Sequence, residues 1–272
     1  MNIDGYINKN KGLEICFFGI IIPFLFNFFI LSALLIITNK FFEFDVNNRE
    51  MLFEYQIAVN IICFIFYILL YNFKLKNYFN LKPVISINNM DRKILKYILV
   101  ISFSFALFFD ILFYLLNPYL KDSITANNID TIMNLNKYIA ILSVVIFSPI
   151  NEEILYRMFL FKSIRTITYD KKLSFIFSAI ISSTIFAVFH FGISQIIYAF
   201  FASLLFCFIL EKYNNIVLTI IMHIIMNLSS FFINNEISNI TNNKMLLFML
   251  VVFILIFCFS FKLLLDFKSE EK

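Results

Sequence analysis

Long apolar stretches alternate with short polar segments along almost the whole chain. A helix needs about 20 predominantly apolar residues to cross the hydrocarbon layer of a bilayer. The stretches that approach this length are residues 15–38, 55–73, 97–116, 138–161, 173–190, 193–210, 216–233 and 245–265. The pattern therefore predicts an all-α, polytopic membrane protein with about eight transmembrane helices.

The composition agrees with lipid as the solvent of this chain. Of its 272 residues, 61% are hydrophobic and 39 are Phe, which is too apolar for a soluble surface around a single core. The longest polar stretch, about residues 74–96, is typical of a loop rather than a folded domain. We expect one membrane-embedded domain over residues 1–272, with a motif-bearing core at about 138–233.

The basic residues indicate how the helices are oriented. When the polar segments are assigned alternately to the two sides of the membrane, 16 of the 22 Lys and Arg residues fall on one side and 5 on the other, and Arg157 lies inside a predicted span. Basic residues accumulate on the cytoplasmic side, so we expect both termini to be cytoplasmic. The net charge of +4 is spread over short loops, so nothing favours a nucleic-acid partner, and the lipid bilayer is the expected charged neighbour.

The fourth predicted span contains three charged residues. An ionised side chain at the bilayer centre costs about 2.5–3.5 kcal/mol, which makes such residues functional candidates. Glu153 and Arg157 are four residues apart with the acid first, the order that favours an ion pair. Glu152 points about 100° away from that pair and is free to face another neighbour. Pro149 lacks an N–H, so it loosens the helix and admits water near the carboxylates.

The chain contains only two histidines, and both lie within or at the edge of predicted spans. His190 follows Phe186 by four residues, and Asn227 follows His223 by four residues, so each pair shares one helix face. With Glu152, two imidazoles and a carboxamide from three spans are candidates for one polar cavity.

The estimated depths of these groups differ, however. At 1.5 Å per residue, Glu152 lies about 15 Å and His223 about 12 Å from the cytoplasmic ends of their predicted helices, whereas His190 lies about 25 Å away. A shared site therefore requires the fifth helix to begin well inside the cytoplasm or to tilt strongly. Gly192 marks a tight junction that should join the fifth and sixth helices as a hairpin.

The polar residues of these spans form an ordered set of three motifs. They read Glu152-Glu153-x-x-x-Arg157, Phe186-x-x-x-His190 and His223-x-x-x-Asn227. This set resembles the CPBP family of intramembrane endopeptidases, which includes type II CAAX prenyl proteases and bacteriocin-processing or abortive-infection proteins. The resemblance covers about Ser148 to Asn227. Met158 departs from the pattern, since family members commonly have Gly there, and this change alters packing without removing a catalytic group.

The resemblance implies hydrolysis of a peptide bond in a membrane-associated protein or peptide. Glu152 would be the general base that activates water, and His190 would bind or orient that water. His223 and Asn227 would stabilise the developing oxyanion, while Glu153 and Arg157 would support the site. Substrates would be CAAX-type proteins, or peptides in bacteriocin processing and self-immunity. The bias towards Phe, Ile, Asn and Lys is typical of an AT-rich genome and favours a bacterial plasma membrane.

The same residues are compatible with two mechanisms, one with a catalytic zinc ion and one without a metal. Glu152, His190 and His223 are the minimum set for a catalytic zinc with an open water position. Soluble zinc proteases, however, place two His on one helix beside a Glu, whereas each His here has its own helix. We therefore expect no obligatory cofactor and keep zinc as the alternative.

Two other kinds of protein use similar residues. Intramembrane Glu and His also serve transporters and ion carriers as proton or metal relays, although no inverted repeat is visible here. A non-catalytic immunity or scaffold membrane protein is the third interpretation. Asp110, in the third span, fits none of the motifs, and the sequence leaves its role open.

Overall fold

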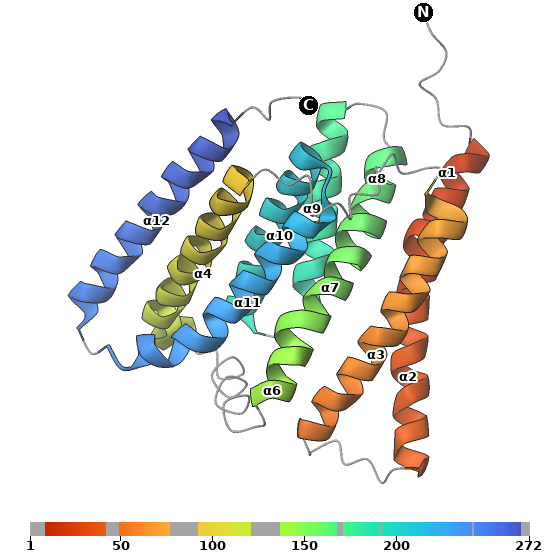
Figure 1. Ribbon diagram of the computed structural model, residues 1–272, viewed down its shortest axis with the longest axis horizontal. Coiled ribbons are helices and arrows are strands. Elements are labelled where there is room, and N and C mark those ends of the chain that lie inside the picture. Colours follow the sequence, from red (N-terminus) through yellow and green to blue (C-terminus); the bar gives the residue numbers. More distant parts are fainter. Residues whose placement is uncertain are drawn as a thin grey trace, which may run out of the picture.

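The computed structural model describes residues 9–41, 49–76, 92–120, 137–167, 171–190, 192–240 and 242–267. These residues form helices with a few turn residues, and no β-strand occurs among them. Figure 1 shows the helices side by side in one bundle. The predicted all-α fold is confirmed.

The first half of the chain supplies three long helices. The first consists of α1 (Lys9–Cys16), η1 (Phe17–Ile21) and α2 (Ile22–Phe41); the second of α3 (Arg49–Leu70) and η2 (Tyr71–Leu75); and the third of α4 (Arg92–Leu120). The segments labelled η are π-helical. In Figure 1, α2 and α3 lie at one side of the bundle and α4 lies beside α12 (Asn243–Asp266) at the other.

The fourth long helix carries both candidate glutamates, Glu152 and Glu153, and is called the motif helix. It consists of α6 (Lys137–Ala140), η4 (Ile141–Phe147), α7 (Ser148–Glu152), η5 (Glu153–Phe161) and α8 (Lys162–Ile167). It is followed by α9 (Lys171–Val188), α10 (Ile193–Tyr213) and α11 (Ile216–Ser238). Helix α11 packs against α4 on one side and against η4, α7 and η5 on the other.

Among the described residues, seven helices are long and apolar enough to cross a membrane. They are Lys11–Lys40, Met51–Leu75, Arg92–Leu120, Tyr138–Thr166, Ile193–Tyr213, Ile216–Ile233 and Asn243–Asp266. The predicted span 173–190 is instead a shorter apolar helix, Leu173–Val188. Its length at 1.5 Å per residue is roughly 24 Å, less than the ~30 Å hydrocarbon layer. The chain is a multi-pass membrane protein, with one helix shorter than the pattern predicted.

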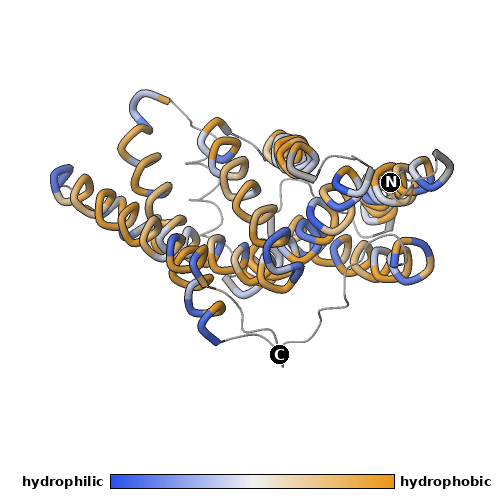
Figure 2. The backbone as a smooth tube through the Cα atoms, turned by 90° about the horizontal axis from the view of Figure 1, so that it is seen from above, coloured by the Kyte–Doolittle hydropathy of each residue, from blue (hydrophilic) through white to orange (hydrophobic). Residues whose placement is uncertain are grey.

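The outer helices expose large apolar side chains. Phe28 and Phe29 in α2 and Phe248 and Phe259 in α12 are each more than 60% exposed. Figure 2 shows that hydrophobic residues make up most of the backbone trace. Such faces are a liability in water but match lipid tails, which are as apolar as the side chains themselves.

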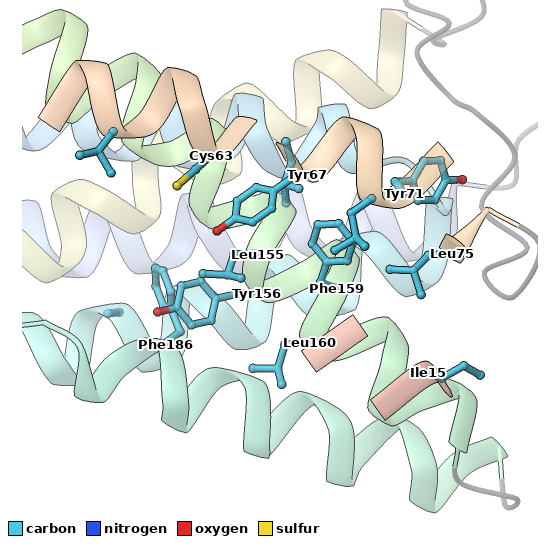
Figure 3. Packing of buried hydrophobic residues seen from close by; sticks show 14 of the residues in the cluster. Ile15, Cys63, Tyr67, Tyr71, Leu75, Leu155, Tyr156, Phe159, Leu160 and Phe186 are labelled. Atoms are coloured by element: carbon cyan, nitrogen blue, oxygen red, sulfur yellow. The ribbon is translucent and has the colours of Figure 1, made fainter. Parts of the chain in front are cut away.

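A buried aromatic cluster holds the motif helix between α3 and α9. Tyr67 of α3 packs edge-on against Phe159 at 5.4 Å between ring centroids, and Tyr156 packs edge-on against Phe186 of α9 at 5.1 Å. Figure 3 shows these rings facing one another from the three helices. Aromatic edge-to-face pairs contribute beyond their buried area, so the cluster fixes where the motif helix presents its polar residues.

The hairpin between α9 and α10 turns at the predicted glycine. Gly192 has φ 94° and ψ 142°, a conformation that a side chain with Cβ disfavours. The His190 N–H donates to the Ala187 carbonyl at 3.0 Å. His190 therefore lies in the turn, just beyond the last residue of α9.

Candidate active site

The motif helix departs from regular α-helical geometry around the glutamates. A π-helical segment, η4, precedes α7, and a second one, η5, begins at Glu153. Pro149 lies in the short α7 between them. π-Helical turns occur frequently at functional sites, and the proline accounts for part of the irregularity because it has no N–H to donate.

One carbonyl freed by this irregularity is bonded by Asn227. The Ser148 N–H donates to the Ser143 carbonyl, and the donor expected for the next carbonyl in a π-helical pattern is Pro149, which has none. The Asn227 Nδ2 of α11 donates to that carbonyl, Val144 O, at 3.0 Å. This bond sets the orientation of the amide and leaves its second N–H for another acceptor.

Glu153 and Arg157 form a fully buried ion pair. Arg157 Nη1 lies 3.1 Å from Glu153 Oε1, and both side chains are 0% exposed. The guanidinium carbon lies 4.3 Å from the ring centroid of Phe186 and 4.9 Å from that of Phe206. Among the described residues, no Arg157 N–H makes a hydrogen bond of acceptable geometry, so charge and ring faces hold this side chain.

His223 joins the two glutamates. Its Nδ1–H donates to Glu153 Oε1 at 2.9 Å, and its Nε2 lies 3.7 Å from Glu152 Oε2. The imidazole stacks on Phe206 with 5.2 Å between ring centroids and is only 7% exposed. One oxygen of Glu153, Oε1, therefore faces both the Arg157 guanidinium and the His223 ring.

The two carboxylates differ in access. The Glu152 side chain is 30% exposed, whereas that of Glu153 is 0% exposed. This difference separates two adjacent residues of the same type into one that is partly exposed and one that stays inside the fold.

His190 completes the cluster from the α9–α10 turn. Its Nδ1–H donates to the Phe186 carbonyl at 2.9 Å, because a carbonyl can only accept. In the neutral ring this leaves the lone pair on Nε2. The Phe186 ring lies 4.6 Å from the His190 ring and 5.9 Å from the His223 ring, and Glu152 is close enough to act on His190 electrostatically.

The position of α9 explains why unequal depths were estimated from the sequence for His190 and His223. Phe186 lies near the end of α9, 15 residues after Lys171, yet it contacts His223, which lies only seven residues after Ile216 at the start of α11. Helix α9 therefore begins further from the site than α11 does. The motif helix also continues to Ile167, beyond the predicted end at residue 161.

Polar residues of α3 bond the other side of the motif helix, and they were not among the candidates predicted from the sequence. Asn151 Nδ2 donates to the Asn60 carbonyl at 2.5 Å and to Asn60 Oδ1 at 3.0 Å. Gln56, one turn earlier, bonds Ser148 at 3.2 Å and Ser143 at 3.1 Å. Two amides four residues apart in an apolar span were the available signal.

The candidate zinc ligands do not form a compact ligand set. Among the described residues, no three His, Cys, Asp or Glu side chains gather closely enough to hold a metal ion. His223 Nδ1 is already bonded to Glu153, and its Nε2 lies at ion-pair distance from Glu152. The described side chains therefore offer no preformed metal centre.

Comparison with known protein families matches part of the chain. Residues 134–229 match the family described as type II CAAX prenyl endopeptidase Rce1-like. The matched region contains all three motifs and leaves out every described helix before α6, together with α12. No curated protein and no solved structure matches the chain.

Proposed function

We propose, from the family match over residues 134–229, that the chain is an intramembrane protease of the CPBP family, related to type II CAAX prenyl endopeptidases. We propose further that Glu152 is the general base of its peptide hydrolysis. The scissile bond would belong to a membrane-associated protein or peptide. The observation that carries the proposal is the difference in access between two adjacent glutamates, 30% for Glu152 and 0% for Glu153.

In this mechanism Glu152 takes a proton from a water molecule as the water oxygen attacks the peptide carbonyl carbon. The second O–H of that water donates to the lone pair on His190 Nε2, whose availability follows from the Nδ1–H bond to Phe186. The new C–O bond forms a tetrahedral intermediate. Glu152 then returns its proton to the leaving nitrogen as the C–N bond breaks, so one water is consumed for each bond cleaved.

Two donors support stabilisation of the oxyanion in that intermediate. Protonated on both nitrogens, His223 donates from Nδ1 to Glu153 and from Nε2 towards the developing charge, and the two glutamates offset its positive charge. Asn227 offers the N–H that its bond to Val144 leaves over. Preorganised donors in a low-dielectric site are worth more than the same donors in water.

Glu153 and Arg157 would position His223 without touching the substrate. Arg157 neutralises Glu153, and Glu153 in turn fixes the orientation of the imidazole. Two rings, Phe186 and Phe206, enclose the guanidinium. We propose that this buried group sets the geometry of the site and that Glu152 carries out the chemistry.

We propose further that the enzyme needs no obligatory metal, with zinc on Glu152, His190 and His223 as the alternative. The substrate is proposed to be either a prenylated CAAX-type protein or a peptide processed in bacteriocin maturation or self-immunity. The residue bias of the sequence favours a bacterial plasma membrane as its location.

The proposal is tested with purified protein in liposomes. Quenched-fluorescent peptides ending in a farnesylated CAAX sequence are compared with the same peptides lacking the lipid, which distinguishes the two substrate classes. Wild type should cleave at least one set, and Glu152→Gln should lose on the order of 10²–10⁴-fold in rate while remaining folded. Cleavage at the wild-type rate by Glu152→Gln would overturn the assignment. Absence of cleavage by wild type across both sets would favour a transporter or a non-catalytic immunity protein.

A further inference from the structure

Asp110 is a carboxyl side chain inside a membrane-spanning helix, and the proposed chemistry does not use it. It lies well within α4 (Arg92–Leu120), and α4 lies outside the family match. An ionisable side chain in a membrane span costs free energy, so such residues usually have a function. The contacts of Asp110 indicate which function that is.

The Asp110 carboxyl is bonded to the helix that carries His223. The Ser230 hydroxyl of α11 donates to it, at 2.9 Å from Oδ2 and 3.1 Å from Oδ1. Tyr198 of α10 brings a third polar group close to Asp110, and its ring packs against Phe105 and Phe109 of α4. Among the described residues, no Lys, Arg or His forms an ion pair with Asp110. What Asp110 offers its neighbours is a hydrogen-bond acceptor.

Ser230 belongs to a polar stripe on α11. His223, Asn227 and Ser230 are spaced by four and three residues, which places them within about 60° of one another on the helix. Each bonds a different element: His223 bonds Glu153, Asn227 bonds the Val144 carbonyl, and Ser230 bonds Asp110. From this one face, the stripe therefore bonds α11 to both the motif helix and α4.

The remaining contact between α4 and α11 is apolar and gives little information about register. Ile101 and Phe105 of α4 belong to one buried cluster with Met222 and Met226 of α11. In a membrane, such side chains gain little over lipid tails, and polar bonds between helices specify how the helices align. The Ser104 hydroxyl of α4 bonds within its own helix and cannot perform this alignment.

We infer that Asp110 is a positioning residue: by accepting from Ser230 it fixes the rotation and height of α11, and so the placement of His223 and Asn227 opposite Glu152. The inference rests on the proposed function. Ser230 lies about 10 Å from His223 along the helix, so Asp110 does not touch the substrate and acts only through α11.

The chain offers a closely matched control for the serine. Ser229 is the neighbour of Ser230, and its hydroxyl donates within α11 to the Ile225 carbonyl at 2.7 Å. Ser230→Ala should lower kcat about tenfold with KM nearly unchanged, because misplacement of catalytic groups by a fraction of 1 Å slows the reaction without weakening binding. Ser229→Ala should leave both constants within about twofold. Equal kcat values in the two variants would overturn the inference.

Variants of the acid separate hydrogen bonding from charge. Asp110→Asn keeps an oxygen that accepts from Ser230 and should retain kcat within about threefold, while Asp110→Leu should lose it as Ser230→Ala does. Combining Asp110→Leu with Ser230→Ala should add nothing further to the loss, because both remove the same bond. Positioning through this bond would be contradicted if Asp110→Asn lost as much activity as Asp110→Leu. Additive losses in the double variant would also contradict it.

Glu152→Gln is assayed beside these variants so that the two proposals fail separately. Suppose that wild type cleaves, Glu152→Gln does not, and Ser230→Ala cleaves at the wild-type rate. This result would overturn the positioning role alone. Full activity of Glu152→Gln would remove the proposed mechanism itself. Because Asp110→Leu is the variant at greatest risk of misfolding, Ser230→Ala, which deletes a single oxygen, carries the test.

Discussion

Replacing Arg157 by alanine should destabilise the folded protein, in addition to any effect on catalysis. Arg157 and Glu153 are both 0% exposed, and 3.1 Å separates their charged atoms. Removal of one member of a buried pair leaves the other charge uncompensated, at a cost of about 3–5 kcal/mol. Glu153 still accepts a bond from His223, so the lower end, about 3 kcal/mol, is expected. For a chain of this size that corresponds to a fall in Tm of roughly 6–12 °C.

Thermal unfolding in detergent measures this effect, and two companion variants show its cause. Arg165→Ala breaks an ion pair with Glu211 whose side chains are 18% and 32% exposed, and such a partly solvated pair is worth about 0–1 kcal/mol. Arg157→Ala combined with Glu153→Gln removes the unpaired charge and should recover part of the lost stability. A Tm for Arg157→Ala no lower than that for Arg165→Ala, or no recovery in the double variant, would refute the reasoning.

Three further outcomes are expected. Asn227→Leu leaves the Val144 carbonyl without its donor and should cost about 1–3 kcal/mol in thermal stability as well as kcat; normal stability would limit Asn227 to catalysis. In a cysteine-free background, an impermeant thiol reagent applied to intact cells should label Lys244→Cys and not Arg92→Cys. The reverse pattern would contradict the expected cytoplasmic location of both termini. Protein freed of metal should keep full activity; loss to a chelator with restoration by stoichiometric zinc would favour the zinc mechanism.

The helices were readable from the sequence because lipid imposes a simple rule on length and polarity. Most predicted spans reappear within a few residues, and the turn at Gly192 lies where the glycine indicated it. The exception, α9, has a length that apolar composition alone does not reveal. Its apolar run continues through His190, but the helix ends at Val188, and the His190 N–H bonds the Ala187 carbonyl in a turn.

The site was only partly readable. The i,i+4 spacing of Glu153 and Arg157 is local, and their pairing follows from helix geometry. The bond between His223 and Glu153 joins residues 70 positions apart, and no spacing rule predicts such a contact. The bond from Asn227 to Val144 depends on a π-helical segment whose register is set by packing and by Pro149.

Hydrolysis of one substrate by excess enzyme in oxygen-18 water tests the central claim most directly. If Glu152 activates a water that attacks the carbonyl, the new C-terminal carboxylate formed in a single turnover should contain one oxygen-18 atom, as measured by mass spectrometry, and Glu152→Gln should yield no product. An unlabelled carboxylate would mean that a protein oxygen attacked instead. Labelled product from Glu152→Gln at the wild-type rate would mean that another group activates the water, and either result would contradict the account.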